Sequence, residues 1–383
     1  MVRLASRMPD MKKGFYGFFE PPPPGVVRFT VGEPDFDTPR PIVDAAIKAL
    51  DNGDTHYVGS DGRLNLREAV ANKLREENGI PADPKNVVIT LGGKEPLQDA
   101  MLAVLDPGDE LILHSPSWPT YDPQVVIAHG KPVNVKVRSD NYHPDVEATK
   151  EAITPRTKMM IINSPNNPTG AVYTKDELKA MADLAVDHDF IIISDEIYEK
   201  MVYGGREHIS IGSFPEVADR VITTNGYSKA FAMTGWRLGY VHAGSEIMDK
   251  VRLTHLHNLT CAVSFQMDAG VVALTQCEQY IKDMVSEYDR RRILLKDGLN
   301  SIEGFVAPEP EGAFYAFVNI KGTGFDPMTL YRRLLEEAKV MLIPGTLFEY
   351  GEEYVRFSYA TSYEQVGEGI ERIRNWFAAN RPA

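Results

Sequence analysis

The sequence predicts an α/β fold in which a large domain contains a mostly parallel central sheet and a smaller α+β domain accompanies it. Short apolar segments alternate with amphipathic ones along the first three quarters of the chain. Each apolar segment is continuous, which is typical of strands buried on both faces of a parallel sheet. With 383 residues, 43% of them hydrophobic, the chain is long enough for more than one domain.

The elements of the large domain follow from these periodicities. Helical spacing of apolar residues predicts helices at residues 41–50, 66–77, 96–105 and 175–187. Continuous apolar runs predict strands at residues 87–90, 110–114, 158–163, 190–194 and 220–225.

A long charged helix, expected at residues 276–302, marks the change of domain. Beyond it the pattern predicts strands at 312–319, 340–343 and 355–358, and helices at 330–339 and 364–379. Segments of both kinds, without strict alternation, suit a smaller α+β domain.

Composition excludes several classes of partner. The net charge of −13 argues against binding to nucleic acid or to an anionic membrane. No apolar run reaches membrane-spanning length, and the N-terminus lacks the apolar region of a signal peptide. Cys261 and Cys277 have no metal-binding or redox spacing, which suits reduced thiols. We therefore expect a cytoplasmic protein.

The N-terminal region is irregular. Residues 14–19 are rich in aromatic side chains, and residues 21–24 are four consecutive prolines that should be extended and stiff. The aromatic side chains either pack on their own chain or form a flap over a substrate entrance or a neighbouring subunit.

Residues 223–240 form the most informative segment. They set Lys229 among small and hydroxyl-bearing residues, with Arg237 eight positions later. A lysine becomes a Schiff-base former when its surroundings lower its pKa, and an arginine can bind a phosphate. The alternative is a surface lysine in a glycine-rich loop, which leaves unexplained two further segments, residues 163–170 and 194–198.

These three segments, in this order, resemble the fold-type I aminotransferases that use pyridoxal 5′-phosphate (PLP), and in particular the aspartate aminotransferase-like subgroup of class I/II. The resemblance extends from residues 31–35 to residues 354–358. It implies a PLP-binding large domain at 45–285, an N-terminal arm that joins the small domain at 1–44, and a small domain at 286–383. It also implies a homodimer with shared active sites.

Asp195 directly follows the expected strand 190–194, at the sheet edge where α/β folds bind ligands. A half-buried carboxylate there needs a cation, although capping a helix is the commoner role of such a residue. The resemblance makes Asp195 the partner of the protonated ring nitrogen of PLP. It makes Tyr198 and Asn167 the donors to the ring 3′ oxygen, with Asn167 also at the substrate.

Gly92 and Gly93 stand between an expected strand and an expected helix. Glycines let a phosphate approach backbone amides, and the helix N-terminus favours an anion. Gly93 and Lys94 would offer amides, while Arg237 and Ser228 would add charge and a hydroxyl. In the family, the phosphate-binding hydroxyl often stands at the position of Gly226, and Ser228 is our substitute for it.

The resemblance assigns the remaining site residues. Trp118 would stack on the ring, although a packed core tryptophan is the plainer alternative. Tyr57 would reach the cofactor phosphate of the other subunit. Arg356 would bind the substrate α-carboxylate with help from the backbone of Gly32, and Lys94 would face the distal carboxylate of an acidic substrate.

The expected reaction moves an amino group from an L-amino acid to a 2-oxo acid such as 2-oxoglutarate, with Lys229, Asp195 and Tyr198 as catalytic residues. Lys229 would carry the proton, and general base catalysis of this kind contributes roughly 10²–10⁴-fold. Aspartate, or a related or aromatic amino acid, is the expected donor. A PLP-dependent carbon–sulfur β-lyase would have the same cofactor contacts and stays open as an alternative.

Overall fold

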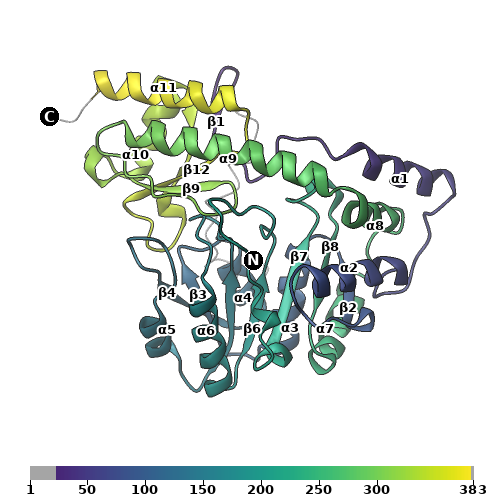
Figure 1. The fold of residues 1–383 in the computed structure, drawn as a ribbon. Helices are drawn as coiled ribbons and strands as arrows, with labels where there is room; N and C mark the ends of the chain where they lie inside the picture. The colour runs from purple at the N-terminus through teal and green to yellow at the C-terminus, as the bar shows by residue number, and fades with distance from the viewer. Residues whose placement is uncertain (1–22, 381–383) are drawn as a thin grey trace, which may run out of the picture.

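A computed structural model describes residues 23–380 of the chain. Its large domain contains a seven-stranded sheet with the strand order β2-β8-β7-β6-β5-β3-β4 (Figure 1). β8 runs antiparallel to both of its neighbours, and the other neighbouring strands are parallel. The predicted mostly parallel sheet is confirmed, with strands β2 (Val87–Thr90), β3 (Glu110–Ser115), β4 (Lys131–Lys136), β5 (Thr157–Asn163), β6 (Ile191–Asp195), β7 (Val221–Gly226) and β8 (Gly239–His242).

Helices pack around this sheet. α3 lies against α7, and α1 and α2 lie against α8. α6 begins with a capping box, because the side chains of Thr174 and Glu177 each accept a backbone amide of the other residue. The helices are α1 (Arg40–Asp51), α2 (Leu64–Glu76), α3 (Lys94–Val104), α4 (Tyr121–Ile127), α5 (Val146–Ala152), α6 (Lys175–His188), α7 (Ser245–Asn258) and α8 (Gln266–Gln276).

The small domain combines a three-stranded antiparallel sheet, ordered β11-β12-β9, with a two-stranded parallel pair, β1-β10. α9 runs beside α11 and reaches from the small domain towards α8 (Figure 1). The elements are β1 (Val27–Arg28), α9 (Glu278–Asn300), β9 (Tyr315–Asn319), α10 (Pro327–Arg333), β10 (Val340–Met341), β11 (Ile343–Pro344), β12 (Tyr354–Ser358) and α11 (Tyr363–Ala379).

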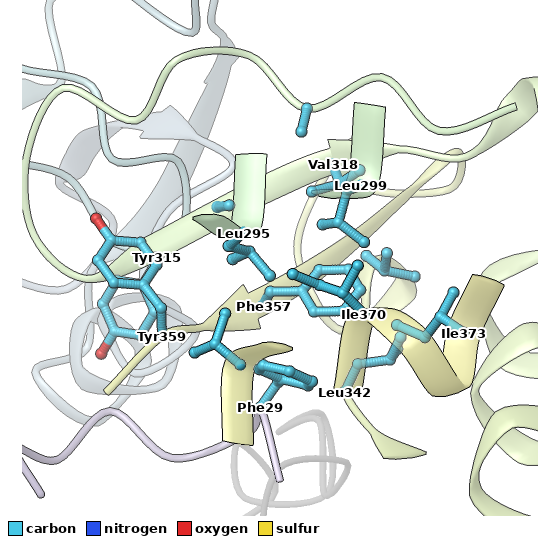
Figure 2. Packing of buried hydrophobic residues seen from close by; sticks show 14 of the residues in the cluster. Phe29, Leu295, Leu299, Tyr315, Val318, Leu342, Phe357, Tyr359, Ile370 and Ile373 are labelled. Carbon is cyan, nitrogen blue, oxygen red and sulfur yellow. The ribbon is translucent and has the colours of Figure 1, made fainter. Parts of the chain in front are cut away.

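One apolar core joins the N-terminal segment to the small domain. Phe29 packs edge-to-face on Phe357, with ring centroids 5.3 Å apart, and Leu299 and Ile370 complete the contact from α9 and α11 (Figure 2). Burial of such side chains is worth roughly 1.5–3 kcal/mol each. The position of the domain boundaries at residues 44 and 285 stays a prediction.

Several elements differ from expectation. The expected strand 340–343 is divided between β10 and β11, which belong to different sheets on either side of Leu342. The expected helix 330–339 is α10 followed by a single π turn, Leu334–Ala338. β1, β4, β8, α4, α5, α7 and α8 were not predicted, and β4 escaped because its position at the edge of the sheet leaves it polar and partly exposed.

The aromatic stretch 14–19 and the first two prolines of the 21–24 run lie outside the described residues. Within residues 23–380, no helix is both long enough and apolar enough to cross a membrane.

Candidate active site

A cavity of about 310 Å³ is enclosed by residues from both domains. All of the predicted site residues except Tyr57 line it: Gly32, Gly93, Lys94, Trp118, Asn167, Asp195, Tyr198, Ser228, Lys229, Arg237 and Arg356. Thr30, Val31, Glu33, Tyr121, Asn163, Ile197, Thr234 and Tyr315 complete the wall. Asp195 and Asn167 reach it from the carboxyl ends of β6 and β5, as expected for an α/β sheet.

Lys229 lies in the turn after β7 and donates a hydrogen bond from Nζ to the carbonyl oxygen of Gly32. The side chain lines the cavity and is partly buried. This burial lowers the pKa of Lys229 to about 8, an effect that Glu33 opposes and Arg237 increases. A substantial fraction of Lys229 is therefore neutral near physiological pH and can act as nucleophile or base.

Asp195 ends β6 and is buried. Burial raises the pKa of Asp195 to about 6, although the Tyr121 hydroxyl and the Ile197 amide stabilise the carboxylate. The Tyr121 hydroxyl donates to Oδ2 over 2.7 Å, and the Ile197 amide donates to Oδ1 over 3.3 Å. Because both of these donors are neutral, the carboxylate suits a ligand that brings a positive charge.

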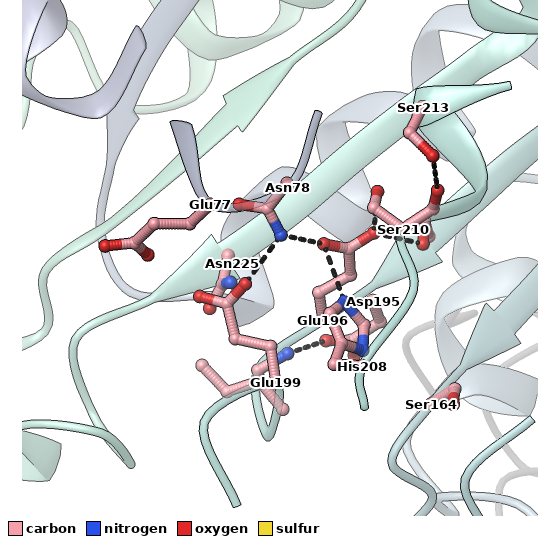
Figure 3. A network of polar contacts seen from close by, with 12 residues as sticks. Glu77, Asn78, Ser164, Asp195, Glu196, Glu199, His208, Ser210, Ser213 and Asn225 are labelled. Atoms are coloured by element: carbon pink, nitrogen blue, oxygen red, sulfur yellow. Dashed lines mark hydrogen bonds and ion pairs between the residues drawn. The ribbon is translucent and has the colours of Figure 1, made fainter. Parts of the chain in front are cut away.

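The turn that carries Asp195 and Tyr198 presents a second set of side chains to its rear (Figure 3). There the Asn78 amide nitrogen donates to Glu196 over 3.2 Å and to Glu199 over 2.8 Å. Lys73 binds Glu199 and donates to the Asn78 carbonyl oxygen over 2.7 Å. Glu196 also accepts from Ser194 and Ser210 and pairs with His208. This rear network anchors the turn from behind.

Tyr198 and Asn167 supply polar groups to the cavity wall near Arg356. The hydroxyl oxygens of Tyr198 and Tyr315 lie 2.8 Å apart. Burial raises the pKa of Tyr198 well above its usual value, so the phenol stays neutral and keeps a proton to donate. The Asn167 carbonyl oxygen accepts from Arg356 Nη1 over 3.1 Å.

Arg356, on β12, is almost completely buried. Its Nη2 donates to the Thr30 carbonyl oxygen over 2.7 Å, and with the bond to Asn167 this fixes the guanidinium in the cavity wall. Gly32 approaches closely here, since a Cβ at this position would lie 2.0 Å from the Tyr315 hydroxyl oxygen. A fixed guanidinium beside bare backbone suits a carboxylate.

The end of the cavity at the N-terminus of α3 has the features of an anion site. Gly93 is the N-cap residue of α3, and Gly92 has a φ of 73°. A Cβ at Gly92 would lie 2.6 Å from Arg237 Nη2, so the guanidinium packs directly on this turn. Ser228 adds its hydroxyl to the same wall.

Lys94 and Trp118 form one side of the cavity. Lys94 Nζ lies 5.5 Å from the centroid of the Trp118 ring, and burial lowers the pKa of Lys94. The Trp118 ring meets Tyr121 edge-to-face at 5.4 Å, which holds its plane. Tyr57 lies apart, 88% exposed, and its predicted contact with the other subunit stays a prediction.

Two contributors were missed from the sequence. Tyr121 stands in the same motif as Trp118, and Tyr315 stands in the expected strand 312–319. Neither residue was assigned a function from the sequence. Their contacts with Asp195 and Tyr198 join residues 74 and 117 positions apart. Their spacing in sequence carries no signal of these contacts.

Comparison with known proteins gives one consistent family. The family model for aminotransferase class I and II matches residues 24–373. The chain is 44% identical to aromatic-amino-acid aminotransferase 2 of Thermococcus litoralis, over 91% of each chain. It is also 44% identical to the aspartate aminotransferase of Pyrococcus abyssi, over 91% of this chain and 90% of the other.

A solved structure gives the same result. The aspartate aminotransferase from Thermus thermophilus with maleate superimposes with a TM-score of 0.92 at 40% identity, covering 98% of this chain and 100% of the other.

Proposed function

The chain belongs to the class I and II aminotransferase family and is an aminotransferase, and we propose that it uses PLP to move an amino group from an L-amino acid to a 2-oxo acid. The observation that carries this proposal is the pair formed by Lys229, whose pKa is lowered, and Asp195, whose pKa is raised, across one cavity. Opposite shifts in one site are typical of acid–base catalysis.

The residues present fit PLP. Asp195 offers a buried carboxylate whose described donors are neutral, which suits the protonated ring nitrogen. The first turn of α3, with Arg237 and Ser228, offers backbone amides, a cation and a hydroxyl, which suit the phosphate. Trp118 offers a flat face for the ring. Asn167 and Tyr198 offer donors for the ring 3′ oxygen.

PLP, when bound, supplies an electrophilic carbonyl carbon and a ring that stabilises negative charge at the substrate α-carbon. Asp195 keeps the ring nitrogen protonated. Lys229, with its pKa near 8, would take the proton from the substrate α-carbon as a neutral amine and, as an ammonium ion, deliver it to the cofactor carbon that bears the nitrogen. Arg356 would hold the substrate α-carboxylate in the cavity that Lys229 also lines.

Lys94 supports a donor range that includes acidic amino acids. Its ammonium group lies over the Trp118 ring at the cavity wall and offers a charge for a distal carboxylate. The two relatives at 44% identity have names that point to one substrate class each. We therefore propose aspartate and aromatic amino acids as donors.

The test of the chemistry replaces Lys229 with Ala and uses Lys250→Ala, on the exposed side of α7, as the matched control. Lys229→Ala should abolish turnover and the absorbance of lysine-bound cofactor, and Lys250→Ala should keep both. Turnover in Lys229→Ala would refute the assignment. Pyruvate release without an amino acceptor would favour the β-lyase reaction instead.

The test of specificity compares Lys94→Ala with wild type over a panel of amino donors, with 2-oxoglutarate as acceptor. Loss of one charge-assisted contact costs about 1.5–3 kcal/mol, or roughly ten- to hundredfold in kcat/KM. That loss should fall on aspartate and glutamate and spare phenylalanine and tyrosine. An equal loss for both classes would show that Lys94 does not read the distal carboxylate.

A further inference from the structure

His255 is buried on α7, outside the cavity, and none of the proposed catalytic steps uses it. Its Nδ1 lies 2.7 Å from Glu95 Oε1, and its Nε2 lies 3.0 Å from the carbonyl oxygen of Ser60. A carbonyl oxygen accepts hydrogen bonds and cannot donate one, so Nε2 carries a proton. With Nδ1 directed at a carboxylate, the ring is satisfied on both sides as an imidazolium.

Each partner of His255 leads to a different part of the proposed site. Glu95 is the second residue of α3, and its other carboxylate oxygen accepts the backbone amide of Leu91, immediately before Gly92 and Gly93. Ser60 is three residues from Tyr57, in the segment expected to reach the other subunit. One side chain therefore joins the turn of the anion site to the segment that carries Tyr57.

We propose that His255 is a positioning residue that holds the anion-binding turn at residues 91–94 and the Tyr57 segment in register. This inference rests on the proposed function, because the anion is the phosphate of PLP. Glu95, Asp99 and His255 have the composition of a metal site. The hydrogen bonds at both ring nitrogens assign a proton, rather than a metal ion, to this cluster.

The charges around the ring favour its protonated form. Burial alone would lower the pKa of His255, but the hydrogen bond and charge of Glu95, the Ser60 carbonyl and the charge of Asp99 together raise it. Asp99 Oδ2 lies 3.8 Å from Nδ1, and burial raises the pKa of Asp99 to about 7, so its charge favours the imidazolium mainly above that pH. Asp61, next to Ser60, is paired at 3.0 Å with Arg252 of α7. A raised pKa means that the positioning contact is complete at low pH and is lost as the pH rises through that pKa.

The test measures PLP binding to the apoenzyme of wild type, His255→Gln and His257→Gln over a range of pH, with inorganic phosphate as a second probe. His257 is an exposed histidine on the same helix and serves as the matched control. At low pH, His255→Gln should bind PLP and phosphate about tenfold more weakly than wild type, since a charge-assisted hydrogen bond is lost. His257→Gln should bind as wild type does.

The pH dependence separates positioning from general structural damage. The ratio of the Kd of His255→Gln to that of wild type should fall towards one as the pH rises, because wild type then loses the same charge. Titrations that the two proteins share, such as those of Lys229 and the phosphate, cancel in this ratio. A general loss of structure would leave the ratio raised at every pH.

A second variant keeps the test decisive if His255→Gln does not fold. Glu95→Gln keeps the shape of its side chain but removes the negative charge, so the pKa of His255 should fall, and the weakening of PLP binding with pH should begin at lower pH than in wild type. Unchanged binding in the variants, at every pH, would overturn this inference while leaving the proposed function intact. Failure of the wild-type apoenzyme to bind PLP would instead overturn the proposed function.

Discussion

The hydrogen bond from Tyr121 to Asp195 gives a prediction whose size follows from the structure. Burial raises the pKa of Asp195 to about 6 from the usual 3.8, which costs the ionised apoenzyme about 3 kcal/mol. The Tyr121 hydroxyl reduces that cost by donating to Oδ2 over 2.7 Å. Such a bond is worth about 1.5–3 kcal/mol to the charged group and about 0.5–1.5 kcal/mol to the neutral one, so Tyr121→Phe should raise the pKa of Asp195 by about 1.

The sign of the effect on stability follows from proton binding. The folded pKa of Asp195 lies above its unfolded value, so its contribution to stability is complete below the unfolded pKa and is lost as pH rises through about 6. In Tyr121→Phe the pKa of Asp195 is higher, so stability continues to fall up to a higher pH. The variant should therefore be less stable than wild type by about 0.5–1.5 kcal/mol at pH 5, where the carboxyl is mostly neutral, and by about 1.5–3 kcal/mol at pH 8.5.

The assay is urea unfolding of the apoenzymes at both pH values. Asp195→Asn supplies the control background, because an amide does not titrate and Tyr121→Phe should then cost the same at pH 5 and pH 8.5. In the protein that keeps Asp195, the stability lost through Tyr121→Phe should grow with pH. A loss that stayed constant would refute the reasoning, since it would show that the hydroxyl does not stabilise the ionised carboxylate.

Three further predictions concern the walls of the cavity and the dimer. Arg356→Lys should raise KM for all amino donors alike, because an ammonium cannot reproduce a two-pronged guanidinium contact; steady-state kinetics that showed the loss for one donor class only would contradict this. Asn78→Leu should lower the free energy of unfolding by about 1–3 kcal/mol, measured in urea against the exposed control Asn72→Leu, because the buried Glu196 and the partly buried Glu199 lose their shared donor. Mixing inactive Tyr57→Ala and Lys229→Ala subunits should restore part of the activity under subunit exchange, and an active monomer would contradict shared sites.

The parts of the site that the sequence predicts are those that depend on strand ends. Asp195, Asn167 and Gly93 each follow an apolar run, and the carboxyl ends of parallel strands meet at one sheet edge. Strand recognition was therefore enough to bring Asp195 and Asn167 together. Gly93 follows β2, which runs in the same direction as β7 only because the antiparallel strand β8 lies between them. β8 is four residues long and was not predicted.

The parts that the sequence does not predict depend on contacts between distant segments. Thr30 holds Arg356 across 326 positions, and the ring of Tyr315 meets Gly32 from the small domain. Glu95 stands just before the expected helix 96–105 and was given no role, and its bond to His255 spans 160 positions. Periodicity reports the face on which a side chain lies and carries no information about the partner that it meets.

The turn from Asp195 to Glu199 links the cavity to the rear network of hydrogen bonds. Its backbone bonds, from Glu199 to Glu196 and from Met201 to Tyr198, have a spacing of three residues. This spacing directs Asp195 and Tyr198 into the cavity and the two glutamates into the rear network. A change on either side therefore moves both.

Lys94 and Trp118, by contrast, meet the cavity from the start of α3 and from the segment before α4, and the Lys94 ammonium group lies 5.5 Å from the centroid of the Trp118 ring. Trp118 packs on Tyr121, which binds Asp195, whereas the Lys94 side chain comes from a different element and can change without moving the turn that holds Asp195. Donor range can therefore differ between relatives, as in the two that are equally similar to this chain, while the residues that would hold the cofactor stay in place.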